Sequence, residues 1–134
     1  MILVDSSVWV DYFNGTISEE TEYLDSILGV EPIAIGDLIL TEVLQGFRYD
    51  SDYRRAKSLL TALSVCQLLN SHRAIRTADY YRALRKSGTT IRKTTDMIIG
   101  TYCIETQTPL LYSDRDFDPM VIHLDLQPAL TRSK

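Results

Sequence analysis

The chain has 134 residues, of which 45% are hydrophobic and 24% are charged, values typical of one globular domain with its own core. No apolar run approaches the roughly 18 residues of a membrane span, which excludes a membrane-spanning protein. Two cysteines and two histidines are too few for a disulfide framework or a histidine-rich metal site. The start MILVDSS lacks the basic segment and cleavage site of a signal peptide, so we expect a cytoplasmic protein in a reducing compartment.

The net charge of −4 conceals an uneven distribution of charge. Residues 1–47 contain nine acids and no Lys or Arg, whereas residues 48–93 contain eleven Lys or Arg and three acids. A basic middle third in an acidic chain indicates a surface that faces phosphates, although a solvated helix face would have the same composition. Its main bases are Arg73, Arg76, Arg82, Arg85, Lys86, Arg92 and Lys93.

Strands and helices are predicted to alternate along the chain. The apolar run Ile2 to Val4 predicts a buried strand, and the Asp-Ser-Ser that follows predicts the start of a helix that ends at Asn14-Gly15. Further strands are expected at 32–35, 65–69, 110–112 and 121–124, and further helices at 18–28, 37–46, 52–63, 75–85 and 96–107. This alternation is typical of a single α/β domain over residues 1–134, with a mostly parallel central sheet flanked by helices.

Three acids fall where such a sheet binds its ligands, outside the carboxyl ends of the strands. Asp5 ends the first strand, Asp114 follows the strand at 110–112, and Asp96 begins a helix at the same edge. These residues are distant in the sequence, but we expect them to meet.

Glu42 is a fourth candidate. At 100° per residue, the helix at 37–46 places Glu42 beside Leu38 and Ile39 on the rim of an apolar face. A partly buried carboxylate needs a partner, and the first 47 residues contain no Lys or Arg that could serve.

Each acid also has an ordinary structural explanation. Asp5 could cap a helix, and Asp96 could favour a helix N-terminus through the macrodipole. Asp114 could lie in a turn, and Glu42 could be exposed. Together these explanations are weaker, because all four positions are expected to converge.

Convergence has an electrostatic cost. Two carboxylates about 4 Å apart repel by roughly 4 kcal/mol at an effective dielectric constant of 20, so a cluster needs a cation or bound protons. An all-oxygen ligand set favours Mg²⁺, or alternatively Mn²⁺, over zinc. Such a site suits phosphodiester hydrolysis, because the ion activates water and neutralises phosphate charge.

Four segments in order, ILVDSSVWVDYF, LTEVLQG, TTDMIIGTYC and LLYSDRDF, resemble the PIN-domain ribonucleases, and most closely the VapC-type toxins of toxin–antitoxin pairs. The resemblance covers nearly the whole chain. The acids that match the family's pocket are Asp5, Glu42, Asp96 and Asp114.

The resemblance implies further roles and partners. Asp5 and Asp96 match the most regular magnesium ligands, and Ser6 and Asp116 match residues with supporting roles. The family implies a homodimer, a small antitoxin that fills the active site, and structured RNA substrates, often transfer RNA. Arg115 departs from the pattern, because it places a cation beside the pocket that could contact phosphate or pair with Asp116.

Other classes of protein remain to be weighed. A calcium loop beginning at Asp114 would need glycine where Pro119 stands, and we interpret Asp118 as a turn residue instead. A phospho-accepting receiver domain would need a lysine after a late strand, and the last forty residues offer only Lys134. A PIN nuclease of RNA processing or decay, or a non-catalytic RNA-binding PIN-like domain, remains an alternative.

Overall fold

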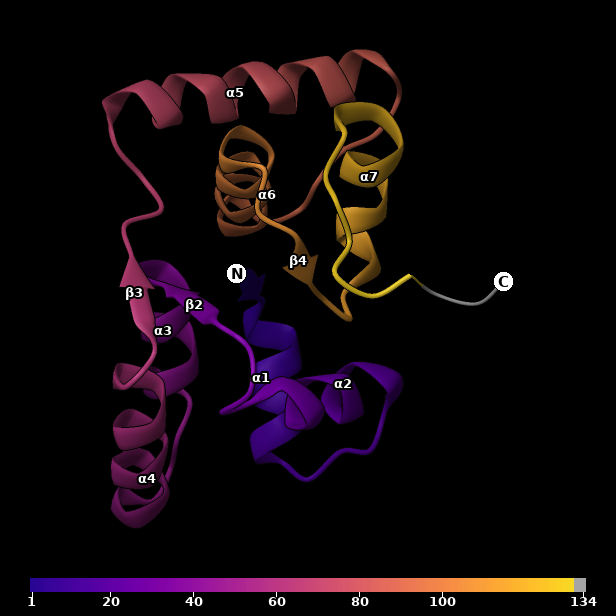
Figure 1. Ribbon diagram of the computed structural model, residues 1–134. Coiled ribbons are helices and arrows are strands. Elements are labelled where there is room, and N and C mark those ends of the chain that lie inside the picture. The colour runs from indigo at the N-terminus through magenta and orange to yellow at the C-terminus, as the bar shows by residue number, and fades with distance from the viewer. Residues whose placement is uncertain (132–134) are drawn as a thin grey trace.

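The computed structural model describes residues 1–131, which form an α/β domain around a four-stranded sheet (Figure 1). The strands are β1 (Ile2–Val4), β2 (Ile33–Gly36), β3 (Ser64–Cys66) and β4 (Leu110–Leu111). Their order is β3-β2-β1-β4, and all three neighbouring pairs are parallel. The predicted α/β class and parallel sheet are therefore confirmed.

The helices up to residue 106 lie close to their predicted positions. In chain order, the helices are α1 (Ser6–Phe13), α2 (Glu19–Ile27), α3 (Asp37–Gln45), α4 (Asp50–Thr61), α5 (Ser71–Lys86), α6 (Thr94–Thr106), the 3₁₀ helix η1 (Arg115–Phe117) and α7 (Asp118–Leu124). The largest difference at a helix start is in α5, which begins four residues before the expected Ile75. Its cap explains the difference, because the Asn70 side chain accepts a hydrogen bond from the Arg73 amide.

The helices form two groups. Contacts join α1 to α2 and α3, and α3 to α4, whereas α5 contacts α6 and α7. Figure 1 shows α5 lying across one end of the molecule beside α6 and α7, with α1 to α4 at the opposite end. The chain adds β2 and β3 on one side of β1 and then returns to place β4 on the other side. With right-handed crossovers, this reversal sends the two helix groups to opposite faces of the sheet.

The core is built from the strands and the inner faces of the helices. Trp9 is fully buried, its ring stacks on Phe13 with 5.9 Å between centroids, and Phe13 packs edge-on against Phe47 at 5.5 Å. These rings join α1 to the end of α3. At the end of β2, a Cβ on Gly36 would collide with the fully buried Leu68, so the glycine is needed for close packing.

One predicted strand is wrong. Residues 121–124 form the last turns of α7, because Pro119 stands in the first turn of the helix, where its missing N–H costs nothing. Asp118 is not a turn residue but the first residue of this helix, and it accepts a hydrogen bond of 2.9 Å from the Tyr112 hydroxyl. After α7 the chain returns beside β4, where Leu110 and Pro128 form an isolated parallel bridge.

The strand expected at 65–69 is shorter than predicted and ends at Cys66. The chain then bends, and the amide of Leu68 donates to the Asp37 carboxylate at 3.1 Å.

In the part of the chain that the structure describes, no helix is both long and apolar enough to cross a membrane.

Candidate metal centre

The acidic residues gather where the strand order reverses. β1 lies between β2 and β4, and its crossovers leave in opposite directions along the sheet. Asp5 directly follows β1, and Asp114 lies three residues after β4. A reversal of this kind is where an open parallel sheet forms its ligand crevice.

Asp5 has two roles at once. One oxygen, Oδ2, caps α1 and accepts hydrogen bonds from the Ser7 amide at 3.1 Å and the Ser7 hydroxyl at 2.6 Å. The other oxygen, Oδ1, is buried and has no hydrogen-bond partner within residues 1–131. The capping role and the site role are therefore compatible, because they use different oxygens.

Asp96 occupies the third position of α6 and is 6% exposed. Its Oδ2 is also buried without a hydrogen-bond partner among the described residues. A buried carboxylate oxygen without a donor is unfavourable unless something else binds it. The first turn of a helix offers only partial compensation through the macrodipole.

Asp114 and Asp116 complete a compact group with Asp96. One carboxylate oxygen from each of the three lies within 4.8 Å of the others. Asp114 also caps η1, because its Oδ1 accepts a hydrogen bond of 3.0 Å from the Asp116 amide. The cap turns the chain so that both acids of the Asp-Arg-Asp segment face α6. Arg115 between them is exposed and makes no ion pair with Asp116 in the described part of the chain.

Glu42 approaches from α3 on the other side. It is half-buried, and the Ser6 hydroxyl donates to its Oε1 over 3.5 Å, at the limit of a hydrogen bond. The cation that acts on Glu42 is Lys93, which immediately precedes α6. Lys93 is far from Glu42 in the sequence, outside the first 47 residues. The position of Glu42 on the rim of an apolar face agrees with the helical-wheel expectation.

The electrostatics show that these carboxylates share one environment. Burial, followed by the charges of Asp5 and Asp114, raises the pKa of Asp96 from 3.8 to about 7, and Lys93 opposes the shift. Burial raises the pKa of Asp5, and its hydrogen bonds from Ser7 only partly offset this. The pKa of Glu42 is raised by burial and by Asp5. The site therefore carries more negative charge than the protein neutralises near it.

A divalent cation fits this arrangement. The structure supplies oxygen ligands only, with two buried oxygens that lack donors and three carboxylates close enough to share an ion. Such a ligand set is typical of Mg²⁺ and Mn²⁺. Asp116 belongs to the compact group, whereas Asp5 is linked to it through the charge of Asp114.

Two contributors were not predicted from the sequence. The Ser7 hydroxyl holds Asp5 and also accepts a hydrogen bond of 3.4 Å from the Ser113 amide, whereas the Ser6 hydroxyl contacts Glu42. Lys93 was assigned to the basic surface, but it also acts on Glu42 and Asp96. The N-cap position of Asp5 was the available signal for Ser7, because an Asp cap bonds the amide two residues on.

The basic middle third divides in two. Arg73 and Arg76 contact the Glu105 carboxylate at 3.0 Å and 3.5 Å, so they contribute to the packing of α5 on α6. Arg82, Arg85, Lys86, Arg92 and Lys93 are exposed. Only this second group retains the phosphate-facing interpretation.

A model of the PIN domain matches residues 2–121 of the chain. The chain is also 31% identical over 134 residues to VapC ribonuclease Mb1587 of Mycobacterium bovis, and the alignment covers 98% of this chain and 100% of that protein. The chain belongs to the PIN domain family and, within it, to the VapC ribonucleases. This membership confirms the resemblance. It excludes the calcium loop and the receiver domain as alternative interpretations.

Solved VapC structures share the fold of this PIN domain. VapBC2 from Rickettsia felis, bound to a DNA fragment from its promoter, aligns with a TM-score of 0.75 at 16% identity, covering 96% of this chain and 97% of that one. VapC20 of Mycobacterium tuberculosis, a toxin that cleaves the sarcin-ricin loop, aligns with a TM-score of 0.63 at 13% identity, covering 88% and 93%.

Proposed function

We propose that the chain is a Mg²⁺-dependent endoribonuclease that acts as the toxin of a toxin–antitoxin pair and hydrolyses phosphodiester bonds in structured RNA. The observation that carries this proposal is the acidic centre, where three carboxylates lie within 4.8 Å and two buried oxygens lack donors. An uncompensated cluster of this kind is stable near neutral pH when a cation shares it.

The residues of this chain divide the work. Asp5 and Asp96 hold the ion, and Asp116 supports them from η1. When bound, the ion supplies an activated water and neutralises charge on the scissile phosphate. Glu42 and Asp114 complete the pocket and orient the attacking water, and the raised pKa of Glu42 suits a group that accepts a proton.

The substrate is proposed to be a structured RNA, with transfer RNA as the candidate. VapC20, which shares this fold, is named for cleaving the sarcin-ricin loop. The exposed bases of α5 and of the segment before α6 provide a positive surface beside the acidic centre. Such a surface binds the phosphate backbone without regard to sequence.

The proposed partners are a small antitoxin and a second copy of the chain, in the cytoplasm. The solved VapBC2 assembly supports an antitoxin partner. Three aromatic residues of α1 are candidates for its binding surface, but Trp9 is fully buried and is part of the core. Tyr12 and Phe13 are half-buried and remain candidates.

A cleavage assay tests the catalytic proposal. Purified protein is incubated with total RNA in Mg²⁺ or in EDTA, and Asp96→Asn is compared with Asp79→Asn, an exposed acid on α5. We expect cleavage by the wild type in Mg²⁺ only. Asp96→Asn should lower the rate at least roughly 100-fold, the upper range for groups that merely support metal ligands. Asp79→Asn should cleave normally, and wild-type cleavage by Asp96→Asn would refute the site.

The toxin role has its own test. Expression of the wild type should arrest growth, and Asp96→Asn should not. Co-expression of the proposed antitoxin, to be sought as a small DNA-binding protein encoded beside this chain, should relieve the arrest. Growth arrest by both forms would show that toxicity does not depend on the acidic centre.

A further inference from the structure

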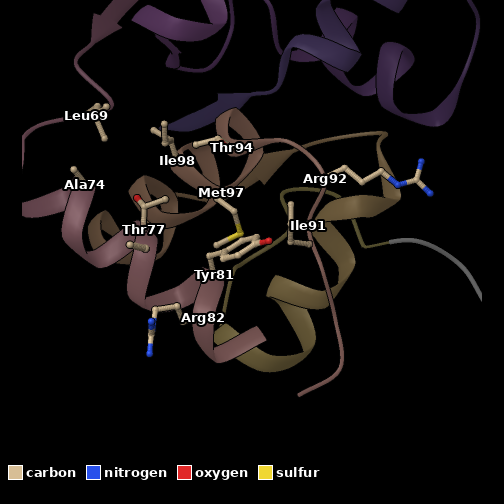
Figure 2. Close-up of a pocket in the computed structure, with 11 residues that line it drawn as sticks. Leu69, Ala74, Thr77, Tyr81, Arg82, Ile91, Arg92, Thr94, Met97 and Ile98 are labelled. Carbon is tan, nitrogen blue, oxygen red and sulfur yellow. The ribbon is translucent and has the colours of Figure 1, made fainter. Parts of the chain in front are cut away.

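A concave site lies at the start of α6, the helix that carries Asp96. It is a cavity of about 450 Å³ between α5 and the segment that leads into α6. Figure 2 shows the Tyr81 ring in the middle of this cavity, near Met97 and Ile91, with Ala74 and Thr77 along one wall. The volume lies in the range of pockets that take small organic groups.

The walls combine an apolar interior with a positive rim. Met97 and Ile91 form a buried apolar floor, and Tyr81 supplies an aromatic ring that is only half-buried. Arg82 and Arg92 extend outward from two sides (Figure 2), and none of the residues that line the cavity is an acid. This is the composition of a site for a flat, apolar group that carries negative charge at its edges.

The cavity is joined to the acidic centre by the first turn of α6. Thr94, Met97 and Ile98 line the cavity, and each stands within two positions of Asp96. Lys93, between Arg92 and α6, is exposed and acts electrostatically on Asp96. A chain of phosphates that leaves the acidic centre along this turn would therefore meet Lys93 and then Arg92.

We propose that this cavity binds an unpaired nucleobase of the RNA substrate, next to the phosphodiester that is cut. The base stacks on the exposed part of the Tyr81 ring, which lies near the buried Met97 and Ile91, and Arg82 and Arg92 contact the phosphates on either side of it. Arg85, whose guanidinium lies 5.5 Å from the centre of the Tyr81 ring, adds charge at the same place. The inference rests on the proposed ribonuclease function and identifies the feature of RNA that the enzyme selects.

Charge complementarity favours an RNA occupant over a protein segment. Among the described residues, those that line the cavity are positive or neutral, and the neighbouring acidic centre suits a phosphodiester. Unpaired bases are the parts of structured RNA that proteins read by stacking on aromatic side chains. The cavity thus selects an extruded nucleotide, whereas the exposed bases of α5 hold the surrounding helix by its phosphates.

A binding comparison tests the base pocket directly. The probe is a short single-stranded RNA that contains all four bases, and its matched partner has the same sugar–phosphate chain with a stable abasic ribose at every position. Affinities are measured by fluorescence anisotropy in Mg²⁺ on the Asp96→Asn protein, so that no probe is cut. We expect the base-containing probe to bind on the order of tenfold more tightly, as stacking of one base on an aromatic side chain predicts.

Three variants on this background locate the preference. Tyr81→Ala removes the ring, and Ala78→Trp fills the cavity from an exposed position of α5, so it does not disturb the core. Both should reduce the preference for bases to less than about twofold. Tyr80→Ala removes a neighbouring half-buried ring that does not line the cavity, and it should retain the full preference. Unfolding curves establish that each variant is folded.

The outcomes separate this inference from the proposed function. If Tyr81→Ala and Ala78→Trp keep the preference of Tyr80→Ala, the base pocket is refuted. If Ala78→Trp weakens both probes equally and changes the molar mass in light scattering, a second copy of the chain covers this face, and the inference is also refuted. The proposed function fails separately, if the otherwise wild-type protein cleaves no RNA in Mg²⁺.

Discussion

The two ends of α6 place carboxylates in opposite environments. Near its start, Asp96 is buried beside other acids, and its pKa is raised to about 7. Near its end, Glu105 accepts from Arg73 at 3.0 Å and contacts Arg76 and His72, and hydrogen bonding and charge hold its pKa below the ordinary value of 4.5 despite burial. The same helix therefore carries Asp96, whose negative charge is poorly neutralised, and Glu105, whose negative charge has three nitrogen partners.

The two environments indicate different roles, a structural one for Glu105 and a functional one for Asp96. Glu105 joins α5 to α6, and its cations come from the basic middle third of the chain. Within residues 1–131, the exposed Lys93 is the one cation that opposes the charges of Asp5 and Asp114 on Asp96. A protein that only had to fold would not bury such a group, so its environment indicates a bound cation that the chain itself does not supply.

After Asp96 itself, the largest effect is expected from the hydrogen bonds that hold the acidic centre. Ser7→Ala removes a donor at 2.6 Å from Asp5, and it should lower RNA cleavage roughly 10- to 100-fold, as for outer partners of metal ligands. Ser6→Ala removes only the 3.5 Å contact to Glu42 and is the matched control, with an expected loss below about threefold. Initial cleavage rates in Mg²⁺ measure both. Equal losses in the two variants would contradict the assignment of Ser7.

A smaller effect is expected at the other end of the helix. Glu105→Gln keeps the shape of the side chain but removes its charge, and it should lower the free energy of unfolding by about 1–2 kcal/mol. Cleavage should remain at the wild-type rate, since Glu105 is not part of the acidic centre. Urea unfolding and the cleavage assay together test this contrast. A loss of cleavage without a loss of stability would show that Glu105 also serves the site.

The strand-end rule predicted one shared edge for Asp5, Asp96 and Asp114. In the structure their charges act on one another, although only Asp96 and Asp114 fall in the compact group with Asp116. To predict the positions of Asp5, Asp96 and Asp114, it was enough to know where the strands and helices end. Turn and cap residues mark these ends well in this sequence. Residue pairs across the fold could not be predicted in the same way. That Lys93 acts on Glu42, 51 positions earlier, depends on how α3 and α6 pack.

Local ambiguity explains the remaining errors. The apolar run at 121–124 is too short for its period to separate strand from helix, and Pro119 in the first helical turn decided in favour of α7. Neighbouring serines after Asp5 could not be ranked from the sequence, because the direction of each hydroxyl depends on the start of α1. The oxygens without donors at Asp5 and Asp96 are likewise visible only once the fold is known.

Thermal unfolding as a function of pH and Mg²⁺ tests the central claim that the acidic centre lacks a cation of its own. Because the pKa of Asp96 is raised from 3.8 to about 7, the unfolded chain releases this proton first as the pH rises. Without metal, stability should therefore fall between about pH 4 and about pH 7, and the raised pKa values of Asp5 and Glu42 act in the same direction.

The decisive comparison uses wild type and Asp96→Asn near pH 8, in EDTA and in Mg²⁺. In EDTA we predict a higher Tm for Asp96→Asn, because the substitution removes a buried charge that its neighbours repel. In Mg²⁺ the wild type should gain stability, because the ion binds only the folded chain, and Asp96→Asn should gain little. A lower Tm for Asp96→Asn in EDTA, together with no effect of Mg²⁺ on the wild type, would contradict the account.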